Sequence, residues 1–241
     1  MRALSLDPTL FWLLVIFLAV DAVALGAFLF TRWREESRKR QEIRHYGDRA
    51  EEKVAQTIER EFPGAVLMND VFLKTRKGTT QLDHILICKW GLYVIETKSH
   101  NGRIQVQDRE WTQIYGEKVV RFHSPVKQNQ NHVNALMAAL DGRRNVPKVA
   151  VRGLVVFTSR HVTFSRPVKE VVRLNELGRT IKGGARGGSR EPVTAAPGRR
   201  YLNNREIAAL EKAVKKCSVR SRAARRRHER AVRTIDRNAR F

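Results

Sequence analysis

The longest apolar feature of the chain is a run from Leu10 to Phe30, in which Asp21 is the only charged residue. At about 1.5 Å of rise per residue, a helix of this length crosses a hydrocarbon core about 30 Å thick. A cleaved signal peptide is the competing interpretation. It needs a basic start and a small-residue cleavage site, whereas only Arg2 precedes this run and Phe-Leu-Phe ends it. We therefore expect a transmembrane helix over residues 10–31, after a short external tail over residues 1–9.

Basic residues are scarce before this run and gather directly after it, at Arg32, Arg34, Arg38, Lys39 and Arg40. Because basic flanks stay on the cytoplasmic side, we expect a single-pass protein of the inner (cytoplasmic) membrane, with its C-terminal domain in the cytoplasm. Residues 32–46 are then a charged juxtamembrane segment. Ala22 and Gly26 have the spacing at which small residues let two membrane helices approach, so a homo-oligomer is a further expectation.

Two helical patterns frame the middle of the chain. Ala50, Val54, Ile58 and Phe62 repeat at i, i+4 spacing, and Pro63-Gly64 ends that pattern. The second pattern begins at Pro125 and continues to about Leu140.

Short apolar runs separated by turn residues predict the strands. The two clearest, Gln81 to Cys88 and Leu92 to Ser99, predict a hairpin that turns at Lys89-Trp90-Gly91. Other strand signals occur at Ala65 to Leu73 (interrupted at Asn69-Asp70), near Ile104, on both sides of Tyr115-Gly116, at Gly153 to Thr158 and at Val168 to Leu174. Strands preceded and followed by helices predict an α/β domain over residues 47–175, with a mixed central sheet flanked by helices.

After this domain the composition shifts to Gly, Arg, Ser and Pro, from which no core can be built. We interpret residues 176–200 as a Gly/Arg-rich linker. Asn203 or Asn204 then caps a short helix, Arg205 to Cys217, which leads into an arginine-rich tail. Residues 201–241 are thus a short helix followed by a basic tail.

The net charge of the chain indicates which kinds of molecule it binds. Lys and Arg number 47 against 24 Asp and Glu, a formal net charge of +23, which favours a polyanion such as nucleic acid or an anionic membrane surface. The two cysteines are too few for a disulfide scaffold or a four-ligand zinc site.

Charged residues also interrupt the predicted hairpin, at Asp83, Glu96 and Lys98. Glu96 and Lys98 share a face because side chains on a strand alternate. A two-residue loop places Asp83 opposite Glu96, and a four-residue loop places it opposite Lys98; both put all three side chains on one face. A three-residue loop turns Asp83 to the other face unless a bulge restores the phase.

Carboxylates on one face repel each other unless a cation lies between them, and hard oxygen ligands select Mg²⁺ or Mn²⁺. Such an ion binds a phosphate oxygen and activates water, and Lys98 beside it can stabilise the developing charge. The competing interpretation is a pair of surface salt bridges on a half-exposed strand.

Several consecutive stretches extend this pattern, in the order Gly47-Asp-Arg-Ala-Glu51, Asn69-Asp-Val, Gly78-Thr-Thr-Gln81-Leu-Asp83-His84, Gly91-Leu-Tyr-Val-Ile-Glu96-Thr-Lys98, Asn101-Gly102-Arg-Ile, Trp111, and Ser124-Pro125-Val-Lys-Gln128 with His132. Together they resemble the nuclease-related domain (NERD) family of the PD-(D/E)xK nuclease-like superfamily, over roughly Gly47 to Thr158.

The resemblance implies a restriction-endonuclease-like core with a central sheet and flanking helices. The transmembrane helix expected from the apolar run precedes that core. It implies Asp83 and Glu96 as metal ligands and Lys98 as the catalytic lysine. It also implies Glu51 as an acid on the first helix and Gln128 as a site residue on the second.

Other residues are candidates for contact with nucleic acid. His132 lies one helical turn from Gln128, and Lys127 is a candidate phosphate contact, although a solvated surface explains Lys127 equally well. In the tail, Arg225, Arg226 and Arg227 suit nucleic acid or an anionic leaflet. His84 lies on the opposite strand face from Asp83, and we interpret it as structural.

The leading hypothesis is a membrane-anchored, Mg²⁺-dependent nuclease that hydrolyses phosphodiester bonds of DNA or RNA. The alternative is an inactive nuclease-like module that tethers nucleic acid or a partner at the membrane. A membrane adaptor that uses its basic tail on lipid is a third possibility.

Overall fold

The computed structural model describes residues 8–76, 78–183 and 201–219. The chain separates into two compact units, Met1–Tyr46 and Gly47–Phe241. The first helix, α1, covers Pro8–Glu61 and so contributes to both units.

In the first unit, α1 carries many exposed apolar side chains, including Trp12, Phe17, Val23 and Leu29. The sequence predicts a transmembrane helix, a juxtamembrane segment and a separate helix after Gly47, but all three lie in one continuous helix. Residues 32–46 contain no Pro, and the i, i+4 pair of Arg40 with Glu36 at 2.7 Å supports helical geometry there. Among the residues whose placement is described, no helix combines the length and the apolar character that a membrane span requires.

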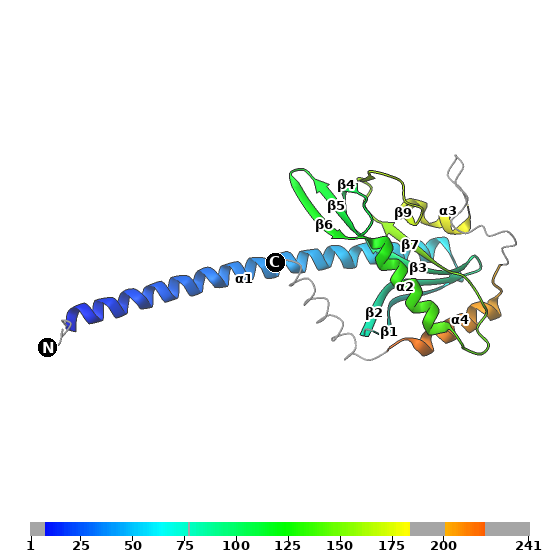
Figure 1. The fold of residues 1–241 in the computed structure, drawn as a ribbon, viewed down its shortest axis with the longest axis horizontal. Helices are drawn as coiled ribbons and strands as arrows, with labels where there is room; N and C mark the ends of the chain where they lie inside the picture. Colours follow the sequence, from blue (N-terminus) through cyan, green and yellow to red (C-terminus); the bar gives the residue numbers. More distant parts are fainter. Residues whose placement is uncertain (1–7, 77, 184–200, 220–241) are drawn as a thin grey trace. The chain divides into compact units, whose positions relative to one another are not determined.

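The second unit is built on a five-stranded sheet in the order β1-β2-β3-β7-β9 (Figure 1). Its strands are β1 Val66–Thr75, β2 Gly78–Cys88, β3 Gly91–Lys98, β7 Val151–Phe157 and β9 Val171–Arg173. The β1-β2-β3 pairs are antiparallel, whereas β7 joins β3 and β9 joins β7 in parallel. The expected mixed sheet of an α/β fold is therefore confirmed.

A second, four-stranded sheet has the order β6-β5-β4-β8. Its strands are β4 Gly102–Gln105, β5 Glu110–Tyr115, β6 Lys118–His123 and β8 Val162–Phe164. The weak strand signals near Ile104 and around Tyr115 are therefore strands, but they form a sheet of their own. Trp111 of β5 stacks on Phe157 of β7, with ring centroids 6.4 Å apart, and a buried apolar cluster joins the two sheets there.

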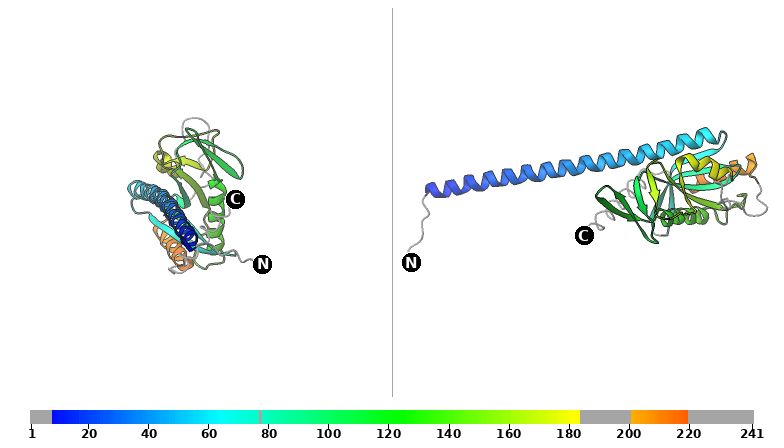
Figure 2. Two further views of the ribbon diagram at one scale, coloured as in Figure 1. Left: turned by 90° about the vertical axis from the view of Figure 1, so that its left-hand side faces the viewer. Right: turned by 90° about the horizontal axis from the view of Figure 1, so that it is seen from above.

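Helices cover both faces of the five-stranded sheet (Figure 2). On one face, Val54, Ile58 and Phe62 of α1 pack against apolar residues of β2, β3 and β7. On the other face lie α2, Pro125–Leu140, and α4, Asn204–Cys217. The i, i+4 spacing on α1 thus marks the side that is buried, as expected.

The packed unit extends further along the chain than sequence analysis expected. After β9 come a 3-10 turn, η1 Leu174–Glu176, and a short helix, α3 Leu177–Lys182. Leu177 and Ile181 are fully buried with the α1 face of the sheet, because their i, i+4 spacing puts both on one side of α3. The predicted start of the linker at residue 176 is therefore too early.

The predicted short helix is α4, and Asn203 caps it by accepting from the backbone N–H of Glu206 at 3.0 Å. Ile207, Leu210 and Val214 of α4 are buried against β1, β2 and α2, so α4 is part of the body rather than an appendage. The remainder of the proposed linker, residues 184–200, and the basic tail from residue 220, which includes Arg225, Arg226 and Arg227, lie outside the described residues.

Candidate functional site

The register of the β2–β3 hairpin decides where Asp83 lies. Cys88 pairs with Gly91 and His84 with Ile95, which is the two-residue-loop register. Asp83 then lies opposite Glu96, just past the last paired residues. There the backbone N–H of Thr97 donates to Asp83 Oδ2 at 2.9 Å. The hairpin thus brings Asp83 to the same end of the sheet as Glu96 and Lys98.

Lys98 connects strand and helix at this end of the sheet. Its Nζ donates to Glu96 Oε1 at 2.6 Å and to Gln128 Oε1 of α2 at 3.2 Å. The Glu96 side chain is only 2% exposed, against 18% for Lys98. A buried carboxylate therefore has a positive charge directly against one of its oxygens.

The second oxygen of Glu96 faces His132. His132 Nδ1 lies 3.3 Å from Glu96 Oε2, one turn along α2 from Gln128. Both atoms are buried, and within the described ranges neither makes a hydrogen bond of good geometry. Gln128 and His132 thus both approach the strand residues; His132, a candidate for contact with nucleic acid, is turned toward Glu96 and only 7% exposed.

The start of α2 is fixed by Ser124 and Pro125, and Asn129, which the sequence did not single out, ties the helix to the sheet. Ser124 Oγ accepts from the backbone N–H of Lys127, and Pro125 occupies the first turn, where no N–H is needed. Asn129 is buried, and its Nδ2 donates to the carbonyl oxygens of Val94 at 3.1 Å and Leu154 at 2.9 Å. The only signal in the sequence was its place on the same helical face as Val133 and Leu136.

Glu51 reaches this site from α1. Desolvation, followed by the negative charges of Asp70, Asp48 and Glu96, raises the pKa of Glu51 to about 7, while Lys98 partly opposes this. Asp70 was not expected here. It lies inside β1, with a positive φ of 53°, and Gln81 Nε2 donates to its Oδ1 at 2.6 Å. The strand is therefore not broken at Asn69-Asp70, as the sequence predicted, but its irregular backbone there puts a further carboxylate near Glu51.

The two central carboxylates have opposite pKa shifts. Desolvation and the charge of Glu96 raise the pKa of Asp83 well above its usual range, against the Thr97 N–H, which lowers it. Desolvation also raises the pKa of Glu96, but Lys98 and His132 outweigh it, so this pKa lies below its ordinary value. Ionising both carboxyl groups together is therefore unfavourable unless a cation stabilises them.

His84 lies on the other face of β2. Its Nδ1 is 2.8 Å from Asn69 Oδ1 and its Nε2 is 3.2 Å from Thr97 Oγ1. Burial lowers the pKa of His84 to about 4, so the ring is neutral near pH 7. It bridges β1, β2 and β3 behind the site, which agrees with a structural role.

Lys127 is separate from this cluster. It is half-exposed and pairs with the exposed Asp108 at 2.8 Å. The hydrogen bond and charge of Lys127 lower the pKa of Asp108. The structure thus puts Lys127 on the surface, which suits either of its two interpretations.

Whether these residues suit a metal ion depends on their donor atoms. No group of three or more His, Cys, Asp or Glu side chains within the described part of the chain is arranged to hold a metal. Two carboxyl groups nevertheless face the same end of the sheet, and Glu96 Oε2 is buried without a hydrogen bond from a described residue. Carboxylate oxygens are hard donors, which fit Mg²⁺ or Mn²⁺ better than a softer metal.

Comparison with known proteins finds a family match over the part of the chain that contains the candidate site. Residues 46–158 match the nuclease-related domain, NERD. The matched residues include Glu51, Asp83, Glu96, Lys98 and Gln128, and also Lys127 and His132. Helices α3 and α4 lie beyond the match, although both pack on the same sheet.

An uncharacterized protein of Bacillus anthracis is 29% identical over 120 residues. The aligned region covers 48% of this chain and 56% of the relative, so the chain spans little more than half of that protein's length. No solved structure matches the chain.

Proposed function

We propose that the nuclease-related domain is a metal-dependent nuclease that hydrolyses phosphodiester bonds of DNA or RNA. The observation that carries the proposal is the contact of Lys98 with Glu96 and Gln128, with Asp83 at the same end of the sheet. In metal-dependent phosphodiester hydrolysis, acids of this kind hold the metal ion and a lysine stabilises the negative charge that develops on the phosphate.

Asp83 and Glu96 would hold the metal ion, Mg²⁺ or Mn²⁺, which when bound supplies an activated water and a counter-charge for the phosphate. The burial of Glu96, whose Oε2 has only His132 Nδ1 at 3.3 Å among the described residues, and the raised pKa of Asp83 support this assignment. A divalent cation there favours the ionised form of both carboxyl groups, because its positive charge offsets the repulsion between the two carboxylates.

Lys98 would act on the phosphate side of the reaction. Its ammonium group donates hydrogen bonds and carries a positive charge, so it can stabilise charge that develops on phosphate oxygens. Gln128 accepts from Lys98 at 3.2 Å and would orient that ammonium group. Glu51, with a pKa of about 7, is suited to exchange a proton near neutral pH.

The test is cleavage of labelled DNA and RNA by the purified chain with Mg²⁺, with Mn²⁺ and with EDTA. We expect Asp83→Asn, Glu96→Gln and Lys98→Ala each to abolish metal-dependent cleavage, and Lys127→Gln to retain most of it. Lys98→Ala should spare metal binding, because an ammonium group cannot ligate a cation. Equal cleavage by all of these variants would refute the proposal.

A second candidate is a non-catalytic module that binds nucleic acid. It is favoured by the 2.6 Å contact between Lys98 and Glu96, which occupies a potential ligand oxygen. A wild-type protein that binds nucleic acid in EDTA and never cleaves it would establish this candidate.

We also propose that residues 10–31 anchor the protein in the inner membrane, with the domain in the cytoplasm. The apolar composition of Leu10 to Phe30, the basic residues that follow it and the exposed apolar side chains of the first unit support this. Recovery of the full chain in the salt-extractable fraction rather than the detergent-extractable one would argue against it. Cross-linking that depends on Ala22 and Gly26 tests the proposed homo-oligomer.

The arginine-rich tail is proposed to bind nucleic acid through Arg225, Arg226 and Arg227. The high positive charge of the chain supports this. Deletion of residues 220–241 should then weaken binding to nucleic acid and reduce its dependence on salt concentration. Loss of vesicle binding without loss of nucleic-acid binding would assign the tail to the lipid surface instead.

A further inference from the structure

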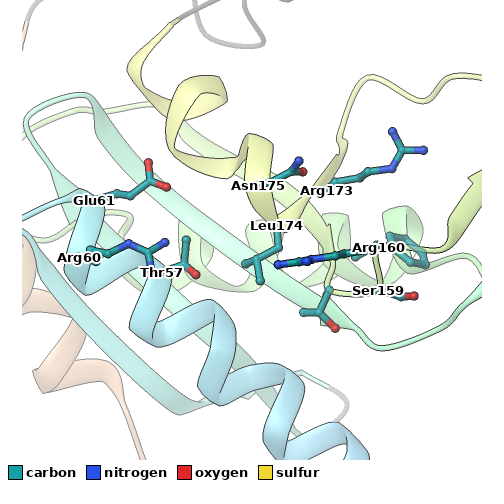
Figure 3. Close-up of a pocket in the computed structure, with 10 residues that line it drawn as sticks. Thr57, Arg60, Glu61, Ser159, Arg160, Arg173, Leu174 and Asn175 are labelled. Atoms are coloured by element: carbon teal, nitrogen blue, oxygen red, sulfur yellow. The ribbon is translucent and has the colours of Figure 1, made fainter.

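A pocket with a volume of about 510 Å³ lies apart from the proposed cleavage site, and none of that site's residues lines it. Three segments form it: the end of the α1 helix, the loop after β7, and the β9–η1 connection (Figure 3). Its lining residues are Thr57, Arg60, Glu61, Phe157, Thr158, Ser159, Arg160, Arg173, Leu174 and Asn175. The volume suits a small organic ligand rather than a single ion.

The pocket is positively charged. Arg60 and Arg160 are exposed and have no ion pair with any acid in the described ranges, and they reach in from opposite sides (Figure 3). Arg173 is engaged elsewhere, because it donates to the carbonyl oxygen of Val162 at 3.0 Å and lies 3.8 Å from Glu176. Two guanidinium groups therefore remain for a ligand.

The one acid of the lining is already compensated. Glu61 Oε2 lies 3.7 Å from Lys182 Nζ on α3, so its charge is partly balanced by a residue outside the pocket. Arg60 and Arg160 thus outweigh it. The pocket attracts an anion, and guanidinium groups bind phosphate through paired hydrogen bonds.

Hydroxyl groups add directional partners. Ser159 Oγ accepts the backbone N–H of His161 at 3.2 Å, which leaves its own hydroxyl hydrogen for a ligand. Thr57 Oγ1 donates to the carbonyl oxygen of Lys53 at 2.8 Å, so it can only accept from a ligand, as from a sugar hydroxyl. The pocket therefore offers a hydroxyl donor for a phosphate from the loop after β7 and an acceptor for a sugar from α1.

We propose that this pocket binds a nucleotide, with Arg60, Arg160 and the Ser159 hydroxyl on its phosphate. Strands β3, β7 and β9 are parallel, and the pocket lies at the carboxyl ends of β7 and β9, where open α/β sheets bind ligands. The loop that carries Ser159 and Arg160 begins at Thr158, whose N–H donates to the carbonyl oxygen of Lys98 at 3.0 Å. A bound nucleotide would thus contact a segment joined directly to the proposed cleavage site.

The nucleotide has two sources, a free nucleotide or one unit of a nucleic-acid strand. Titration calorimetry of the full chain, in EDTA and about 0.15 M salt, with adenosine monophosphate and with a single-stranded oligonucleotide distinguishes them. Because binding is measured without metal and without cleavage, a failed nuclease assay leaves this result unaffected. The variants are Arg60→Gln and Arg160→Gln, with Arg205→Gln on the exposed side of α4 as a control that removes the same charge.

We expect each pocket variant to weaken binding about tenfold, the usual effect of losing a charged hydrogen-bonding partner, and the control to change it less than twofold. If the pocket variants bind adenosine monophosphate as well as the oligonucleotide more weakly than wild type does, the site is assigned to free nucleotides. If they bind only the oligonucleotide more weakly, it is assigned to the nucleic-acid strand. Circular dichroism melting curves that match wild type show that the variants are folded. The proposal is wrong if the pocket variants bind both ligands as the control does, or if wild type binds neither at millimolar concentration.

Discussion

The side chain of Asn129 offers a direct test of how the site is held in place. Asn129→Ala removes two hydrogen bonds, from Nδ2 to the carbonyl oxygens of Val94 and Leu154, in a residue that is 2% exposed. Each is a neutral bond worth about 1 kcal/mol net, and the lost volume adds about 1 kcal/mol. Asn129 Oδ1 is buried without a partner among the described residues, so its removal returns about 1 kcal/mol. We expect a loss of about 2 kcal/mol.

The assay is urea unfolding of the purified chain. The midpoint should fall while the slope m stays constant, because the surface exposed on unfolding changes little. Gln130→Ala is the matched control: Gln130 is the next residue on the same helix, is exposed, and bonds only Asn134 at 3.0 Å in the described structure. It should cost less than about 0.5 kcal/mol.

The cleavage activity of Asn129→Ala separates displacement of α2 from a simple loss of stability. Gln128 and His132 flank Asn129 on α2, so a loosened helix withdraws both from Glu96 and Lys98. At temperatures where Asn129→Ala is still folded, cleavage should therefore fall more than the folded fraction does. Equal urea midpoints for the Asn129 and Gln130 variants would refute the argument that Asn129 fixes α2 to the sheet.

Three further predictions follow from charge and burial. In EDTA, Asp83→Asn should stabilise the protein, because the raised pKa of Asp83 shows that its ionised form is unfavourable in the folded state. Glu96→Gln should destabilise the protein, because it removes the negative charge that pairs with Lys98. Chemical unfolding of both variants checks that the free energy of unfolding changes in opposite directions. The folded-state pKa of Glu51 is raised from 4.5 to about 7, so wild type loses stability as pH rises between these values. The stability of Glu51→Gln relative to wild type should therefore increase over pH 4.5–7 and then level off. A difference in urea midpoints that does not change with pH would contradict this. Leu210→Ala, at a fully buried position of α4, should cost about 2–5 kcal/mol, and a melting temperature equal to wild type would show that α4 is not part of the folded unit.

The sequence was most informative where structure is local. The i, i+4 spacing of Val54, Ile58 and Phe62 predicted the buried side of α1, and alternation in the β2–β3 hairpin predicted that Glu96 and Lys98 share a face. Both patterns depend only on the geometry of one helix or one strand. The register of the hairpin stayed open among three loops, because nothing in the sequence alone distinguishes them.

Long-range packing accounts for what was missed. Ile181 lies in a Gly- and Arg-rich stretch that has little core character by composition, yet it is fully buried against residues more than a hundred positions earlier, such as Ile58. Likewise, the separate sheet that contains Trp111 depends on β4 pairing with β8, far along the chain. A Gly-rich composition therefore gave the wrong boundary, because burial is decided by tertiary contacts.

The α2 helix has one consequence for how this domain can vary. Gln128, Asn129 and His132 lie within about 100° of one another around the helix, and Asn129 is bonded to the backbone of two strands. Each residue advances a helix by about 100°, so a single insertion or deletion between Ser124 and His132 would turn the site residues away while the sheet stayed intact. Substitutions in this segment can be absorbed one side chain at a time, but changes in its length cannot.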